Sequence, residues 1–281
     1  TTTFILTQHN AAISRILLSE NEELKRELMQ KLASGSAVAT VGISHLTTSR
    51  QHLKEPAVKV DEVTEGLILS GQIPWVTSAS RADWIVTGGV QDDGLQVLVA
   101  IDTSEAALQP QSAPPLLALN ESLTASVALE ELRIPTDRLL LGPEPEVLKA
   151  GGAGGVTTST LALGAAQKSI RGIEAEAAQR GDLRASAESL RESLTGLKQE
   201  LTELLTTDEP PAKETLESLR LRSNSLALRS AQAYLTASKG AGFLQNHPAS
   251  RAIREAQFFL VWSCPQPVMA AALEEFSCPT F

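Results

Sequence analysis

The chain has 281 residues and a mass of 29.9 kDa, 42% of its residues are hydrophobic, and its formal net charge is −9. This composition excludes a disordered chain, and the length is sufficient for two or three units with buried cores. No apolar run reaches the ~18 residues that a membrane span requires, and the acidic balance argues against nucleic acid or an anionic membrane as a partner.

The first 33 residues predict two helices. Apolar residues recur at helical spacing over 4–17 and again over 24–32. Ser19 or Asn21 is the expected N-cap of the second helix, because such side chains accept hydrogen bonds from free N–H groups at a helix start. The N-terminus lacks the basic and apolar regions of a signal peptide. Its first residues already resemble the middle of a helix, so we expect the chain to be incomplete at this end.

Residues 36–142 predict a β unit, since runs rich in Val, Ile and Leu alternate there with turn residues. The expected strands are 38–44, 57–60, 67–71, 84–90, 95–101 and 124–129. Hairpin turns are expected over 61–66 and 91–94, because each contains a glycine for the positive φ of such turns. This many short strands in a short segment suggest a small barrel or sandwich.

The remainder predicts helices. A Pro-rich linker over 143–149 precedes expected helices over 151–180, 186–205 and 212–239, and a fourth helix begins at Pro248. Pro210 and Pro211 end the second of these helices, because proline cannot continue a helix. Proline at position 248 suits the first turn of a helix, where its missing N–H is not needed.

Cysteine and histidine usage points to no disulfide framework and no metal site. Cys264 and Cys278 lie close together without the CxxC spacing of a redox pair, so reduced thiols in a cytoplasmic protein are the simpler expectation and a redox pair is the alternative. The four histidines have no ligand-like spacing, so no metal site is expected.

Three segments carry motifs in the same order as these elements. The first is Pro74-Trp75-Val76-Thr77 followed by Ala82-Asp83, and the second runs over 122–127, 131–135 and 138–140. The third contains Gly240, Gly242, Phe243, Pro248, Arg251, Arg254, Glu255 and Ala256, in register without a gap. Together they resemble the acyl-CoA dehydrogenase family of flavoproteins, and the resemblance covers nearly the whole chain.

The resemblance implies an α+β multidomain fold. Acyl-CoA dehydrogenases have an N-terminal helical domain, a middle β-barrel and a C-terminal four-helix bundle. Residues 1–35 would be the remnant of the first domain, 36–142 a small antiparallel β-barrel, and 143–281 the bundle. The family assembles through the bundle, so a homodimer or homotetramer is expected.

The resemblance also implies FAD, rather than FMN, as the cofactor. The cofactor contacts that it implies are Trp75, Thr77, Ser44, His45, Gly240 and Gly242. The family removes the α-proton of an acyl thioester and transfers a hydride from the β-carbon to the flavin. An acyl-CoA or related acyl thioester is therefore the expected substrate, with an unidentified electron acceptor.

The resemblance fails at the positions where the family does its chemistry. The catalytic Glu of many members aligns with Ser263, and the alternative position of the base aligns near Thr157. A hydroxyl is far too weak a base at neutral pH to remove an α-proton, so no catalytic residue is assigned. Thr236 replaces a glutamine that contacts the cofactor in the family, and Lys239 replaces the first of two glycines.

Each candidate residue also has a simpler structural interpretation. Trp75 and Thr77 fit an apolar wall and a polar donor for a flavin, but a buried core tryptophan is the alternative. Ser44 and His45 follow a predicted strand, where the histidine could donate to a flavin carbonyl or make one structural hydrogen bond. For two other candidates the structural interpretation is favoured. Arg251 and Arg254 would pair with a Glu or Asp of a neighbouring helix or subunit, and the Gly-rich run 151–155 would be a flexible helix entry or a helix that approaches another backbone closely.

Three hypotheses for function remain. The first is an FAD-dependent oxidoreductase that oxidises an acyl-CoA or related acyl thioester at the α,β position. The second keeps the fold as a flavin monooxygenase, which needs no carboxylate base and would use Ser44 or His45. The third is a catalytically degenerate, non-enzymatic member, suggested by the replacements at Ser263 and Thr236.

Overall fold

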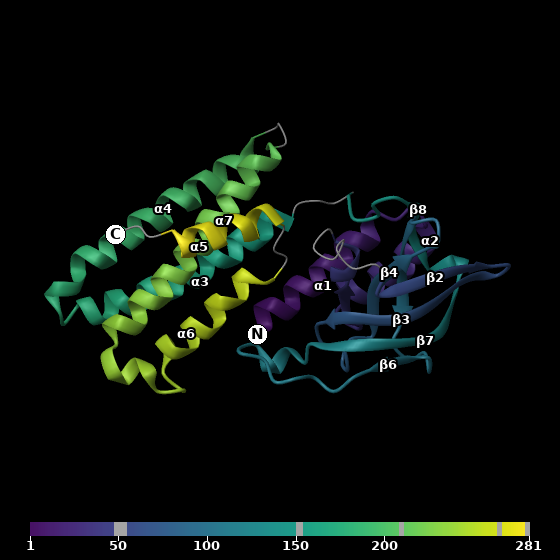
Figure 1. Ribbon diagram of the computed structural model, residues 1–281, viewed down its shortest axis with the longest axis horizontal. Helices are drawn as coiled ribbons and strands as arrows, with labels where there is room; N and C mark the ends of the chain where they lie inside the picture. The colour runs from purple at the N-terminus through teal and green to yellow at the C-terminus, as the bar shows by residue number, and fades with distance from the viewer. Residues whose placement is uncertain (48–54, 150–153, 208–210, 263–265, 279–281) are drawn as a thin grey trace. The chain divides into compact units, whose positions relative to one another are not determined.

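The computed structural model describes residues 1–47, 55–149, 154–207, 211–262 and 266–278. The chain forms two compact units, Thr1–Gly152 and Ala153–Phe281 (Figure 1). The first unit contains two helices and the sheet, and the second unit is helical. The predicted α+β class is therefore confirmed.

The first unit is built on an eight-stranded sheet. Its strands are β1 (Ala39–Gly42), β2 (Val58–Val63), β3 (Gly66–Val76), β4 (Trp84–Val90), β5 (Gln96–Asp102), β6 (Leu108–Pro110), β7 (Ala125–Pro135) and β8 (Leu139–Glu144). The strand order is β6-β7-β3-β2-β4-β5-β8, and β1 pairs with β4 beside this path. All six expected strands are present, while β6 and β8 were not predicted.

The predicted small antiparallel barrel is wrong, because the sheet is mixed and does not close. β1 runs parallel to β4, and β2 meets β4 in a parallel bridge between Lys59 and Val90. Within the described part of the chain, the end strands β6 and β8 do not pair with each other. Pro110 in β6 and Pro143 in β8 are typical of edge strands, since a residue without an N–H cannot donate to a further strand.

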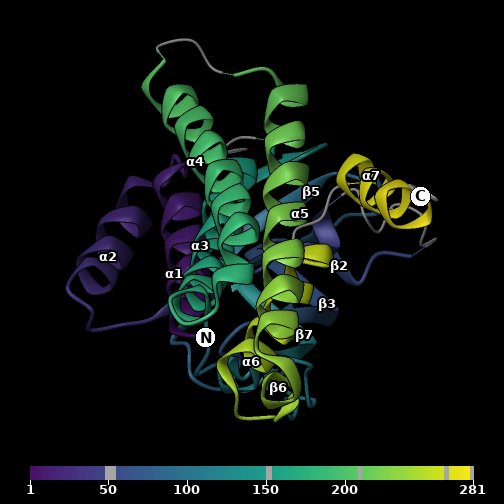
Figure 2. The same cartoon turned by 90° about the vertical axis from the view of Figure 1, so that its left-hand side faces the viewer.

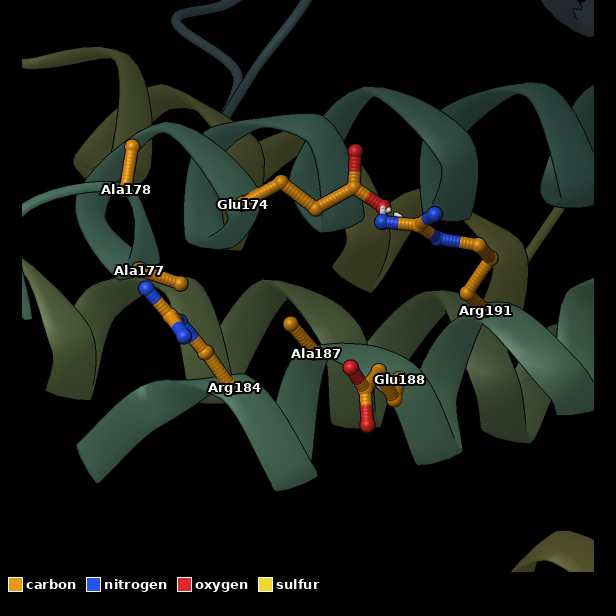
Figure 3. A pocket seen from close by; sticks show the side chains of 7 residues that line it. All are labelled: Glu174, Ala177, Ala178, Arg184, Ala187, Glu188 and Arg191. Carbon is orange, nitrogen blue, oxygen red and sulfur yellow. Dashed lines mark hydrogen bonds and ion pairs between the residues drawn. The ribbon is translucent and has the colours of Figure 1, made fainter. Parts of the chain in front are cut away.

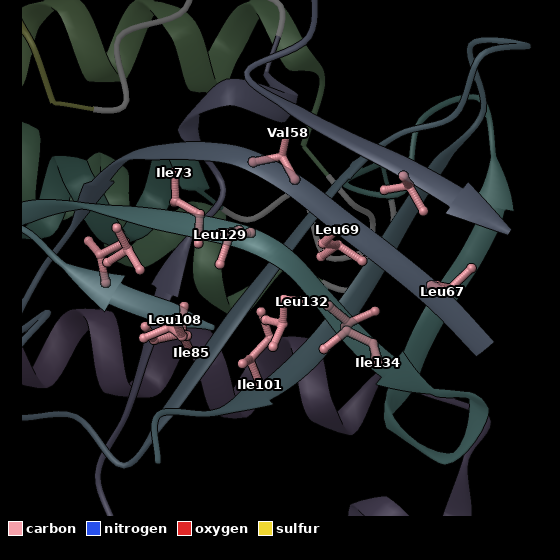
Figure 4. Packing of buried hydrophobic residues seen from close by; sticks show 14 of the residues in the cluster. Val58, Leu67, Leu69, Ile73, Ile85, Ile101, Leu108, Leu129, Leu132 and Ile134 are labelled. Atoms are coloured by element: carbon pink, nitrogen blue, oxygen red, sulfur yellow. The ribbon is translucent and has the colours of Figure 1, made fainter. Parts of the chain in front are cut away.

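Alternate residues of the sheet supply two hydrophobic cores. On one face, Val58, Leu69, Ile85 and their neighbours pack together, as Figure 4 shows. On the other face, residues such as Val86 pack against helices α1 (Thr2–Leu17) and α2 (Glu22–Ala33). Because successive strand residues point to opposite faces, consecutive residues of β4 serve different cores.

The N-terminal helices form as expected and attach to the sheet by polar contacts as well. Asn21 caps α2, and its side-chain oxygen accepts a hydrogen bond from Leu24 N–H at 3.0 Å. The Asn21 side chain also donates to the Asp137 carbonyl at 2.9 Å, and Arg138 pairs with Glu27 at 3.0 Å. These contacts join α2 to the short turn between β7 and β8.

The second unit contains five α-helices in the described residues. They are α3 (Gly154–Ala177), α4 (Arg184–Thr206), α5 (Lys213–Ala237), α6 (Pro248–Gln257) and α7 (Gln266–Ser277). The four predicted helices are confirmed, and α7 is additional. Figure 2 shows the three long helices side by side, and their facing leucines and alanines form the core.

A buried arginine links α5 to the end of the next helical segment. Arg220 is 2% exposed and donates hydrogen bonds to Asn224 Oδ1 at 3.1 Å and to the Trp262 carbonyl at 2.9 Å. Asn224 in turn donates to the Phe259 carbonyl at 3.0 Å. None of the described helices is long and apolar enough to cross a membrane.

Candidate functional site

Trp75 lies near the end of β3 and faces outward. Its exposed fraction is 53%, whereas its neighbours Ile73 and Val76 are fully buried. The pairing of β3 with β7 is irregular between Ile73 and Val76, and such a bulge redirects a side chain. The buried core tryptophan of this unit is Trp84, which is 5% exposed, so the interpretation of Trp75 as a core residue is wrong.

Buried hydroxyl groups meet directly after Trp75. Val76 pairs with Ala125, so Thr77 lies opposite Thr124 in the antiparallel register. Thr124 Oγ1 donates to Thr77 Oγ1 at 3.4 Å, and Ser122 Oγ lies 2.7 Å from Thr124 Oγ1. All three side chains are buried, which costs free energy unless their hydroxyl groups are hydrogen-bonded.

The backbone around these hydroxyl groups is tightly constrained. Ser78 has a φ of 55° and Leu123 a φ of 47°, both in the left-handed region that side chains other than glycine rarely adopt. Ser78 N–H donates to the Ser122 carbonyl at 2.8 Å, and Ala79 N–H donates to the Leu123 carbonyl at 3.3 Å. Strained positions of this kind are concentrated at functional sites, because the surrounding structure must hold them in place.

The structure brings Ser44 and His45 to the same part of the first unit. They begin the 3-10 turn η1 (Ser44–Leu46), which follows β1 and lies against β3 and β4. A Cβ added at Gly42 would lie 2.7 Å from Ile73 Cγ2 and 2.9 Å from Val76 Cγ2. Only glycine permits this approach, which brings β1, the strand directly before Ser44 and His45, against β3, the strand that contains Trp75.

The two side chains have different surroundings. His45 Nε2 lies 2.8 Å from the Gly88 carbonyl, so its N–H donates there and ties η1 to β4. Ser44 Oγ is buried and has no hydrogen-bond partner among the described residues. A buried hydroxyl without a partner is costly, and a bound ligand with a polar edge would satisfy it.

Gly240 and Gly242 lie in η6 (Lys239–Phe243) of the second unit, directly after α5. A Cβ at Gly242 would lie 2.8 Å from Ser238 Cβ, so local packing already requires this glycine. A Cβ at Gly240 would meet no atom within 4 Å. Their role as cofactor contacts stays a prediction. Ser263, where the catalytic Glu of the family aligns, lies outside the described residues.

The remaining candidates have structural partners. Arg251 pairs with Glu255 at 2.6 Å, and Arg254 donates to Ser250 Oγ at 2.7 Å and to the Gln245 carbonyl at 3.1 Å. In the described ranges, no three or more His, Cys, Asp or Glu side chains come together in a way that could hold a metal ion. The sequence predicted that both arginines would pair with a Glu or Asp of a neighbouring helix or subunit. Instead, Arg251 pairs within its own helix, and Arg254 makes hydrogen bonds but no ion pair among the described residues.

Two pockets within the described residues do not suit a flat aromatic ligand. Figure 3 shows one of about 200 Å³ between α3 and α4, where Glu174 and Glu188 alternate with Arg184 and Arg191. A second, of about 650 Å³, is lined by residues 144–146 and Lys149. Neither pocket has an aromatic wall, and Trp75 lines neither of them.

Sequence reasoning assigned no role to Ser122 and Thr124, although both lie in the second motif segment. Thr124 is 47 residues from Thr77 in the chain, so only the register of β3 with β7 brings their hydroxyl groups together. The signal available in the sequence was a pair of hydroxyl residues, Ser122 and Thr124, at the start of the strand predicted over 124–129. That pattern alone does not identify the strand that the pair faces.

No family model matches the chain, and no curated protein matches it either. Solved structures do match its fold. An acyl-CoA dehydrogenase from Geobacillus kaustophilus is 13% identical with a TM-score of 0.81, and the match covers 92% of this chain and 75% of that one. A glutaryl-CoA dehydrogenase from Mycobacterium smegmatis in complex with FADH2 is 20% identical with a TM-score of 0.74, covering 94% and 72%.

A third similar structure comes from a biosynthetic protein. FkbI, described for biosynthesis of the methoxymalonyl extender unit of Fk520, is 17% identical with a TM-score of 0.80, and the match covers 97% of this chain and 78% of that one. Matches at such low identity establish architecture and leave chemistry open. The resemblance read from the three motif segments is thus confirmed for the fold: the chain has the fold of the acyl-CoA dehydrogenases.

Proposed function

We propose that the protein is an FAD-dependent oxidoreductase that oxidises an acyl-CoA or related acyl thioester at the α,β position. The observation that carries the proposal is the exposed indole of Trp75, two residues before the buried hydroxyl of Thr77, which accepts a hydrogen bond from Thr124. The fold supports it, since similar structures include acyl-CoA dehydrogenases and one complex with FADH2.

The side chains of this region fit the requirements of a flavin ring. An isoalloxazine needs an apolar wall and hydrogen-bond donors at its polar edge, and Trp75 and Thr77 are of these two types. Ser44 Oγ adds a buried hydroxyl that has no partner within the described residues. FAD, when bound, would supply a two-electron acceptor, while these residues bind and orient it.

The chain does not provide a carboxylate at either position expected for the catalytic base. Ser263 and Thr157 stand there, and their hydroxyl groups are too weak as bases for α-proton removal. This observation favours two further candidates on the same fold: a flavin monooxygenase, or a degenerate member that binds its ligand without turnover. The electron acceptor is unassigned under all three.

The absorption spectrum of the purified protein tests the proposal. We expect flavin bands in the protein as purified or after FAD is added, and bleaching of those bands when an acyl-CoA is mixed in without oxygen. A colourless protein that does not bind added FAD would refute it. Oxygen consumption by the reduced flavin without bleaching by any acyl-CoA would favour the monooxygenase, and bound flavin with neither reaction the degenerate member.

Two tryptophan variants separate binding from folding. Trp75→Ala is expected to weaken FAD binding by about tenfold or more with little loss of stability, because the side chain is 53% exposed. Trp84→Ala is the control: its side chain is 5% exposed, so the variant should lose about 3–5 kcal/mol of unfolding free energy. Unchanged FAD affinity in Trp75→Ala would exclude this tryptophan as the wall of the site.

Assembly and location are also part of the proposal. We propose a homodimer or homotetramer formed through the helical unit, as in the family that the fold resembles, and light scattering of the purified protein measures this. Gly240 and Gly242 remain proposed cofactor contacts in that assembly. Cys278 is a free, exposed thiol, which fits the proposed cytoplasmic location.

A further inference from the structure

We infer that Thr124 and Ser122 are positioning residues, which orient the hydroxyl proton of Thr77 towards the ligand that rests on Trp75. The inference rests on the proposed function, since it takes the polar edge of a flavin as that ligand. Neither residue would touch the ligand; both would act through Thr77.

The direction of the hydrogen bonds follows from counting protons. A hydroxyl group has one proton to donate and two lone pairs that accept. Thr124 gives its proton to Thr77, so in the pair with Ser122 at 2.7 Å it must accept, and Ser122 must donate. The hydrogen bonds therefore run from Ser122 through Thr124 to Thr77, and the direction of each hydrogen bond fixes the direction of the next. We call these three groups the hydroxyl chain.

Thr77 is the end of this chain. Its oxygen accepts from Thr124, and no described residue accepts its proton. The contact of 3.4 Å is long for two hydroxyl groups, and we expect it to shorten when an acceptor takes the Thr77 proton. A linear chain of this kind also strengthens its terminal donor, because each hydrogen bond polarises the next.

The surrounding backbone is built to hold the first member of the chain. Ser122 is fully buried, and its carbonyl accepts from Ser78 N–H at 2.8 Å and from Ser78 Oγ at 3.4 Å. Leu119 and Leu123 on either side of it both have positive φ, at 65° and 47°. The strained backbone at these two leucines thus holds three buried hydroxyl groups in a position where an ordinary sheet core would have apolar side chains.

The experiment is a double-mutant cycle on FAD affinity, measured by fluorescence titration of the apoprotein. Thr77→Val and Thr124→Val are each expected to raise the Kd for FAD about three- to tenfold, the effect of one hydrogen bond. The double variant should be no weaker than Thr77→Val alone, because Thr124 acts through Thr77. Both single variants should also shift the visible bands of the bound flavin in the same direction.

Matched variants separate positioning from structure. Thr124→Ser keeps the hydroxyl and should retain wild-type affinity and spectrum. Ser122→Ala, a smaller change for use if Thr124→Val does not fold, should weaken FAD binding by less than Thr77→Val. Thr40→Val is the control, since Thr40 Oγ1 is buried without a partner among the described residues, and it should leave both readouts unchanged.

The outcomes are distinct. The inference would be overturned if the increases in Kd caused by Thr77→Val and Thr124→Val multiplied in the double variant. It would also be overturned if Thr124→Val and Ser122→Ala left the Kd unchanged. Either result would leave the proposed function standing. A wild-type protein that does not bind FAD would overturn both. Coupled losses with rescue by Thr124→Ser would support the positioning role.

Discussion

Two glycines on α3 should respond in opposite ways to the same substitution. Gly164 and Gly172 both lie inside this helix, where alanine is intrinsically favoured over glycine by about 0.5–1 kcal/mol. A Cβ added at Gly164 would meet no atom within 4 Å, so Gly164→Ala should stabilise the helical unit by about that amount.

Gly172 packs directly on an aromatic ring of α5. A Cβ there would lie 2.5 Å from Tyr234 Cε2 and 2.7 Å from Cε1, closer than real carbon atoms approach. The ring must move, and such overpacking costs about 1–3 kcal/mol. After the helix gain is subtracted, Gly172→Ala should destabilise the unit by up to about 2.5 kcal/mol.

Urea unfolding followed by helical circular dichroism measures both variants. The background Tyr234→Ala removes the obstacle, so Gly172→Ala should become stabilising there, and the two sites should show a coupling of about 1–3 kcal/mol. If Gly172→Ala were as stable as Gly164→Ala in the wild-type background, the close packing of α3 on α5 as the reason for this glycine would be refuted.

Two further predictions concern charged side chains. Arg220→Met should destabilise the helical unit by about 2–4 kcal/mol, because it leaves its buried acceptors, Asn224 Oδ1 and the Trp262 carbonyl, without this donor. Arg229→Met, on the exposed face of α5, is the control: its unfolding free energy should stay within about 0.5 kcal/mol of wild type in the same assay. Hydrogen bonds from Lys31, and less strongly from Arg138, hold the pKa of Glu27 below its ordinary value. A lowered pKa adds stability that is present above the unfolded-state pKa of roughly 4.3 and is lost as the pH falls through the folded-state pKa. Glu27→Gln should therefore reduce the dependence of the unfolding free energy on pH in the acid range. Glu27 is 38% exposed, so the two proteins should differ in unfolding free energy by less than about 1 kcal/mol. The prediction would be contradicted if the unfolding free energy of both proteins fell equally steeply between about pH 5 and 3.

The sequence was sufficient to predict most helices and strands, but not which strands pair with one another. Continuous runs rich in Val, Ile and Leu predicted β4 and β5, because strands that are buried on both faces are apolar at nearly every position. Such runs carry no information on pairing partners, so the parallel pairing of β1 with β4 was not foreseen. β6 and β8 were missed because they are short edge strands that contain proline, which reads as a turn or linker.

The candidate site was predictable in part for the same reason. The motif segments identified Trp75 and Thr77, and the strand end at Ser44 was visible from composition. The exposure of Trp75 depends on an irregularity in the β3–β7 ladder, and the hydroxyl chain depends on the register of two distant segments. Both arise from tertiary pairing, which local propensity does not specify.

The way α1 and α2 cover the sheet has a practical consequence for anyone who divides this protein into fragments. Leu24 and Leu28 of α2 share a core with Trp84 and Leu98 of the sheet. A recombinant fragment that began after α2 would turn that indole and its leucine neighbours towards water, and contiguous apolar surface of this kind drives aggregation. Shortened forms made for crystallisation or spectroscopy should therefore retain both N-terminal helices.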